Sequence, residues 1–148
     1  MATVDEVVEL SHEQAEREPG MQKEPFQLMI EVRDEQGQLH IAGDMGSGAF
    51  DPGRQMEVGI VLDPVWQSRC IATGACRLLF DHLFAAGLHR ITARVDPRNG
   101  ASIKLFERLQ FVREGLERQC WWDDAYNEWT DEVCFAVLAS EWPARRGN

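Results

Sequence analysis

Residues 56–84 read MEVGIVLDPVWQSRCIATGACRLLFDHLF and contain the pattern that decides the fold. Apolar side chains alternate up to Leu62, which is typical of a strand. From Ile71 onward they recur at helical spacing, and Gly87 stands where a helix would end. The segment QSRCIA, residues 67–72, therefore joins a strand to the start of a helix. Unpaired backbone N–H groups at such a place commonly bind phosphate.

The same two spacings of apolar residues, alternating and helical, predict the secondary structure of the rest of the chain. Residues 3–17 are amphipathic and predict a helix that begins at Thr3, with Glu6 completing a capping box. Short turns between alternating segments predict an antiparallel meander. The expected order is helix, three strands, helix, strand, helix and two strands. The strands are expected at residues 25–33, 38–50, 56–62, 88–95, 111–120 and 132–138. The two later helices are expected at residues 71–86 and 96–109. The first of these later helices is expected to bury Ala75, Leu78, Leu79, His82 and Leu83. The fold class is α/β with a mixed sheet.

Composition restricts the class of protein. A chain of 148 residues is expected to form one domain, residues 1–148. The net charge of −10 argues against a nucleic-acid binder and suits solubility or a cationic substrate. No apolar run approaches the ~20 residues of a membrane span, and the acidic start of the chain does not resemble a signal peptide. The four cysteines show no CxxC spacing, so no metal is expected, and free thiols favour the cytoplasm.

Several motifs occur in an order that resembles the GCN5-related N-acetyltransferase (GNAT) superfamily. They are EVGIVLDPVWQSR, IATGACRLLFDHLFAAGLHRITARVDPRN, GASIKLFERLQFVREG and EWTDEVCFAVLASEW. The likeness covers residues 55–142 and is greatest to the branch that acetylates the N-terminal alanine of ribosomal proteins, the RimJ/RimL-like branch. It implies the acyl-CoA N-acyltransferase fold, a mostly antiparallel sheet with a V-shaped split flanked by helices. The first strand and helix of that fold are expected to be missing. Either the acceptor side is then open, or a partner subunit fills it, or the chain is a fragment.

The resemblance also implies a site for acetyl-coenzyme A. The pyrophosphate would bind the loop and helix start formed by Gln67, Ser68, Arg69, Cys70, Ile71 and Ala72. Cys70 stands where the family usually has glycine, and a positive φ there would cost about 1–2 kcal/mol. Asn99 would bind the pantetheine arm, although its residue type also favours a helix cap. Backbone groups of Ile60, Val61 and Leu62 would pair with the pantetheine amides as an added strand does.

The catalytic residues are less well defined by the sequence. Glu57, on the strand before the loop, is the candidate base, with a surface carboxylate as the alternative. Ser102 is the candidate acid toward the leaving thiolate and also a cofactor contact, with helix capping as the alternative. Two family features are absent: Phe106 replaces a frequent tyrosine, and Trp121 replaces a glutamate found in some members.

The resulting hypothesis is acetyl transfer from acetyl-coenzyme A to a primary amine, either a protein N-terminus or a small amine, by direct attack in a ternary complex. A non-catalytic coenzyme A-binding or regulatory protein of the same fold is the first alternative. An interaction module built on the tryptophan-rich hairpin is the second. Trp121, Trp122 and Trp129, with their acidic neighbours, are compatible with a cationic amine, with hairpin packing, or with a homodimer face.

Overall fold

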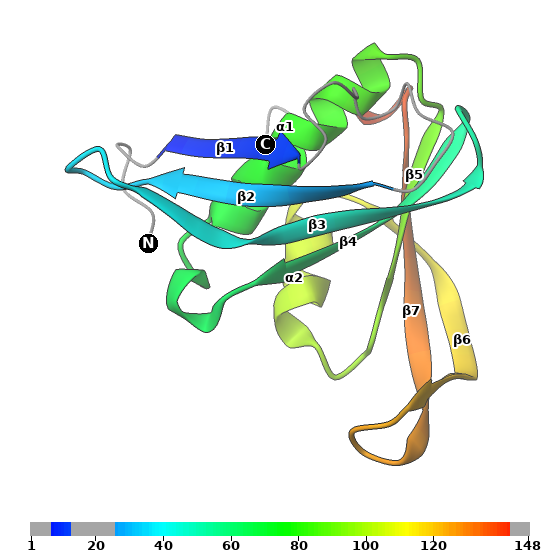
Figure 1. The fold of residues 1–148 in the computed structure, drawn as a ribbon. Helices are drawn as coiled ribbons and strands as arrows, with labels where there is room; N and C mark the ends of the chain where they lie inside the picture. The colour runs from blue at the N-terminus through cyan, green and yellow to red at the C-terminus, as the bar shows by residue number, and fades with distance from the viewer. Residues whose placement is uncertain (1–6, 13–25, 143–148) are drawn as a thin grey trace.

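A computed structural model describes residues 7–12 and 26–142 of the chain. It contains one seven-stranded sheet with the strand order β1-β2-β3-β4-β5-β7-β6 and two α-helices (Figure 1). The strands are β1 (Val7–His12), β2 (Gln27–Arg33), β3 (Leu39–Asp51), β4 (Gln55–Leu62), β5 (Arg90–Val95), β6 (Val112–Asp123) and β7 (Glu128–Leu138). The helices are α1 (Ile71–Ala85) and α2 (Gly100–Arg108), with a 3₁₀ turn at Pro64–Trp66.

The sheet is split between β4 and β5, which are the only parallel neighbours among the described strands. These two strands pair only from Gln55 with Arg90 to Glu57 with Thr92. Beyond that point each continues without the other, while β4 stays paired with β3 and β5 with β7. The predicted V-shaped split in a mostly antiparallel sheet is therefore confirmed.

The hydrophobic core lies on one face of the sheet, beneath α1 and α2 (Figure 1). Leu28, Ile30 and Val32 of β2 point into it, as their alternation predicts. Phe106 of α2 stacks on Phe135 of β7, with ring centroids 5.8 Å apart. The opposite face is more open: Ile41 and Val61 on it are 60% and 65% exposed.

The predicted helix at residues 3–17 is wrong over its central part, where β1 forms instead. β1 runs antiparallel to β2 and places Val8 opposite Val32 and Leu10 opposite Ile30. Without β1 the backbone groups on that edge of β2 would lack strand partners, and the pairing satisfies them. Local helix propensity is a weak preference that such tertiary contacts override. Residues 3–6 and 13–17 of the predicted helix lie outside the described residues.

The buried stripe of α1 differs from its prediction. Leu78 and His82 are not buried, whereas Cys76 and Phe80 are fully buried. Phe80 lies among aromatic rings, 5.6 Å from both Phe111 and Trp142, so this contact sets the rotation of the helix. The end of the helix is as predicted.

Gly87 has a φ of +101°, and the N–H of Leu88 donates to the carbonyl of Leu83 at 3.1 Å.

The last hairpin is longer than predicted. β6 extends to Asp123 and β7 begins at Glu128, so the turn between them is short.

Candidate functional site

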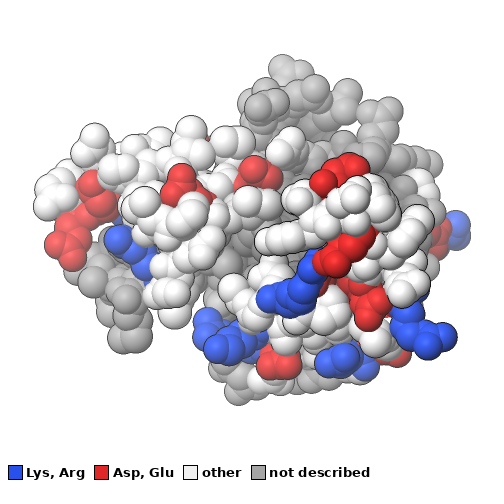
Figure 2. Space-filling view, turned by 90° about the horizontal axis from the view of Figure 1, so that it is seen from below, with Lys and Arg blue, Asp and Glu red and all other residues white. Residues whose placement is uncertain are grey.

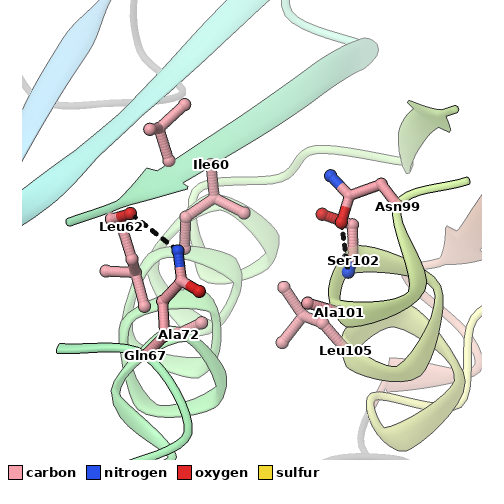
Figure 3. Close-up of a pocket in the computed structure, with 9 residues that line it drawn as sticks. Ile60, Leu62, Gln67, Ala72, Asn99, Ala101, Ser102 and Leu105 are labelled. Atoms are coloured by element: carbon pink, nitrogen blue, oxygen red, sulfur yellow. Dashed lines mark hydrogen bonds between the residues drawn. The ribbon is translucent and has the colours of Figure 1, made fainter. Parts of the chain in front are cut away.

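A groove runs between the end of β4, the start of α1 and the first turns of α2 (Figure 3). It consists of two adjoining hollows of about 210 and 390 Å³. The residues shared by both hollows are Leu62, Gln67, Ala72, Ala101 and Leu105. In Figure 3, Asn99 and Ser102 lie across the groove from Ile60 and Leu62. Because the two hollows share these residues, they form one continuous space that could take an extended ligand.

The loop before α1 has two non-glycine residues in the left-handed region. Ser68 has a φ of 62°, and Cys70, the N-cap of α1, has a φ of 62° and a ψ of 12°. The positive φ whose cost was considered for Cys70 is therefore present in the structure. In the described structure Cys70 forms no side-chain bond to the helix that it caps. The first-turn amides of α1 are thus available to a ligand, and Ser68, Cys70, Ile71 and Ala72 line the groove.

The two other loop residues have their side chains engaged within the chain. The Gln67 side-chain amide donates to the carbonyl of Leu62 at 3.1 Å, which ties the loop to the end of β4. The Arg69 guanidinium lies 4.8 Å from the centroid of the Trp66 ring. Gln67 lines the groove, whereas Arg69 is not among its lining residues.

The start of α2 brings Asn99 and Ser102 together. The side-chain oxygen of Asn99 accepts from the N–H of Ser102 at 3.1 Å, so Asn99 is an N-cap, and both residues line the groove. Lys104 and Arg108 of the same helix also line it. Sequence reasoning missed these two cations. Their i, i+4 spacing places them on one helix face and was the available signal.

The end of β4 presents backbone groups to the groove. Ile60, Val61 and Leu62 pair with β3 on one side, and no β4–β5 pair is described beyond Glu57 and Thr92. All three residues line the groove. Gly43 of β3 makes this arrangement possible, because a Cβ atom there would lie only 2.9 Å from the Cα of Leu62.

A third hollow, here called the basin, is separate from the groove, has a volume of about 320 Å³ and lies at the foot of the split. Its lining residues are Glu57, Arg90, Thr92, Ala93, Arg94, Glu114, Glu117, Cys134 and Phe135. Because side chains alternate along a strand, Glu57 points away from the core face that Met56 and Val58 occupy. The two candidate catalytic residues therefore lie in different hollows, Ser102 in the groove and Glu57 in the basin.

Arg94 forms the electrostatic centre of the basin. Its guanidinium lies 3.2 Å from Glu57, 3.3 Å from Glu117 and 3.4 Å from Glu132. The charge of Glu57, followed by those of Glu117 and Glu132, raises the pKa of Arg94 above its ordinary value.

Glu117, Cys120 and Glu132 also come close enough together to hold a metal ion. Burial raises the pKa of the Cys120 thiol, which disfavours the thiolate that a metal binds. The two carboxylates are already paired with Arg94. Their proximity is explained by that guanidinium.

The tip of the β6–β7 hairpin is tied to the loop before α2. Arg98 pairs with Asp96 at 2.8 Å and with Glu128 at 2.6 Å, and lies 5.2 Å from the centroid of the Tyr126 ring. Arg98 thus occupies the cation–π position of Tyr126. Trp121 remains 63% exposed.

Figure 2 shows basic and acidic side chains interleaved over one face of the molecule.

Comparison with known proteins identifies the family of this chain. The profile of the acetyltransferase (GNAT) domain family matches residues 2–112, and the chain belongs to that family. The uncharacterised N-acetyltransferase YnaD of Bacillus subtilis is 33% identical over 87 residues, 58% of this chain and 50% of YnaD. The chain spans about half the length of this curated relative.

Solved structures of acetyltransferases superimpose on the chain. One from T. thermophilus has a TM-score of 0.73 and 26% identity, covering 83% of this chain and 63% of that one. Mycobacterium smegmatis RimJ, solved with CoA-disulfide, has a TM-score of 0.72 and 29% identity, covering 83% and 58%. The expected likeness to a RimJ-like branch is confirmed. Neither described helix is both long and apolar enough to span a bilayer.

Proposed function

We propose that the groove binds acetyl-coenzyme A and that the protein transfers its acetyl group to a primary amine. The observation that carries this proposal is the coincidence of three features along one groove: the uncapped start of α1, the free edge of β4, and Asn99 at the start of α2. In the proposal the pyrophosphate binds the first-turn amides and the pantetheine arm pairs with residues 60–62. Lys104 and Arg108 add positive charge toward phosphate.

The acceptor amine would enter from the basin and meet the thioester at the split. Glu57 would accept the proton of the incoming ammonium, because only a neutral amine attacks a carbonyl. After the tetrahedral intermediate forms, the C–S bond breaks as the nitrogen loses its extra proton. The Ser102 hydroxyl would relay this proton, donating its own proton to the departing thiolate while it accepts the one released from the nitrogen. These roles for Glu57 and Ser102 are supported by their positions in the two hollows at the split.

A non-catalytic coenzyme A-binding protein is the alternative, and Cys70 is the observation that favours it. A residue with a Cβ atom at φ 62° in the phosphate loop carries strain that glycine would avoid. Calorimetric titration with acetyl-coenzyme A, followed by thiol release across a panel of amines, separates the two. Thiol release that depends on the amine supports the enzyme. Binding without release supports the alternative, and absence of binding contradicts both.

Two further features belong to the same proposal. A homodimer that covers the exposed hairpin is supported by Trp121 and by Tyr126, which is 70% exposed. Light scattering before and after Trp121→Ser tests it.

A cytoplasmic location is supported by the four cysteines, all of which are free thiols.

A further inference from the structure

We propose that Arg94 determines acceptor specificity, by acting as a resident cation that lowers the negative charge of the basin and holds carboxylates that a second ammonium group would otherwise bind. An acceptor with one ammonium group then complements the basin, whereas a polyamine does not. This inference rests on the proposed function in two respects, namely that the protein binds coenzyme A and that the acceptor amine enters through the basin.

Arg94 lies where the two arms of the sheet separate. It lies on β5 two residues beyond Thr92, where β5 has already left β4. Its guanidinium nevertheless contacts carboxylates from three other strands, Glu57 of β4, Glu117 of β6 and Glu132 of β7. One cation therefore draws together acidic side chains from both arms of the split.

The lining of the basin carries a net negative charge. The lining includes three carboxylates, Glu57, Glu114 and Glu117, and two guanidinium groups, Arg90 and Arg94, so the net charge is −1. Arg90 is already paired with Glu114. Arg94 is left to balance Glu57 and Glu117, and it also pairs with Glu132, which lies outside the lining. The carboxylates around Arg94 therefore exceed its charge, and the remainder is left for an incoming ammonium.

A purely structural role would explain Arg94 less well. Its side chain is 48% exposed, and ion pairs at such exposure contribute little to folding stability. Loss of Arg94 would bring the lining to a net charge of −2 and leave Glu132 without this guanidinium. Two adjacent ammonium groups on one ligand would then find matching carboxylates.

The test measures binding of spermidine and of butylamine to the coenzyme A-saturated protein by calorimetry. We expect Arg94→Gln to bind spermidine at least about tenfold more tightly than the unaltered protein, and the gain to shrink at high salt because it is electrostatic. Arg94→Lys keeps the charge and serves as the matched control, with spermidine affinity close to that of the unaltered protein. Adding Glu117→Gln to Arg94→Gln should remove most of the gain.

A spermidine affinity of Arg94→Gln within twofold of the unaltered protein overturns the proposal. If Arg94→Gln does not fold, Glu117→Gln alone decides: it makes the lining neutral and should weaken butylamine binding at least about threefold. Unchanged butylamine binding then overturns the proposal. Because binding is measured without turnover, a protein that releases no thiol would contradict the acetyl-transfer proposal while leaving this comparison decisive.

Discussion

Gly43 of β3 and Val61 of β4 lie so close together that a Cβ atom on Gly43 would overlap the carbonyl oxygen of Val61. The atoms on the β4 side belong to the backbone and cannot rotate away. The shape of the β4 end, where the pantetheine arm is proposed to bind, therefore depends on the absence of one methyl group on the neighbouring strand.

Gly43→Ala should displace the end of β4 and weaken coenzyme A binding more than about tenfold, with a stability loss of about 1–3 kcal/mol from overpacking. Gly46→Ala is the matched control on the same strand, because a Cβ atom there meets no heavy atom within 4 Å. Calorimetry gives the affinity and urea unfolding the stability. Equal affinities for the two variants would contradict the role assigned to the β4 end.

Cys70→Gly should tighten coenzyme A binding or leave it unchanged. Glycine adopts the observed φ of 62° without the strain of about 1–2 kcal/mol that a side chain incurs there, and it lets phosphate approach more closely. Cys70→Ala keeps the Cβ atom and removes the sulfur, so calorimetry on both variants separates backbone strain from the bulk of the thiol. A large loss of affinity in Cys70→Gly would mean that the thiol makes a favourable contact with the ligand.

Much of this fold was predictable because its signals are local. The alternation of Leu28, Ile30 and Val32 and the helix-ending Gly87 depend on neighbours a few residues away, and the structure agrees with both. The first segment was not predictable in the same way, since β1 is defined by pairing with β2, a separate segment further along the chain. Helical periodicity over a short acidic stretch carries no information about such a partner.

The same distinction between local and long-range signals applies to the candidate site. The helix cap at Asn99 follows from its residue type at the start of a predicted helix. The positive φ at Cys70 could be considered from the family's usual glycine but was established only by the structure. The ion pairs of Arg94 link four strands and depend on the register of each. Sequence alone placed Glu57 on a strand face but gave no means of finding the guanidinium beside it.

Asn99 combines a capping role with the proposed pantetheine contact, and two substitutions separate them. Asn99→Ala removes the hydrogen bond to the Ser102 N–H and should lower the stability by about 1 kcal/mol. The same substitution should also lower the affinity for coenzyme A. Asn99→Ser can still cap the helix, so its stability should stay within about 0.5 kcal/mol of the unaltered protein. Loss of the amide contact should still weaken coenzyme A binding about fivefold. If Asn99→Ser binds coenzyme A normally, the contribution of Asn99 is capping alone.

Asp96 gives a prediction for the pH dependence of stability. The hydrogen bonds from the Arg98 side chain, aided by its backbone N–H, lower the pKa of Asp96 below its usual 3.8. A carboxyl group whose pKa is lower in the folded state stabilises the protein above the unfolded value, and this stabilisation is lost as the pH falls through the folded value. Asp96 should therefore contribute fully at neutral pH and progressively less below about pH 4.

Asp96→Asn tests this directly, because it removes the charge while keeping the size of the side chain. Its melting temperature should lie below that of the unaltered protein at pH 7, and the two curves should converge as the pH falls below 3.8. Glu35→Gln, at an exposed site in the turn after β2, neutralises a carboxylate elsewhere and should change the melting temperature little. A difference for Asp96→Asn that persists unchanged at about pH 2.5 would show that the side chain acts through its shape rather than through its charge on Arg98.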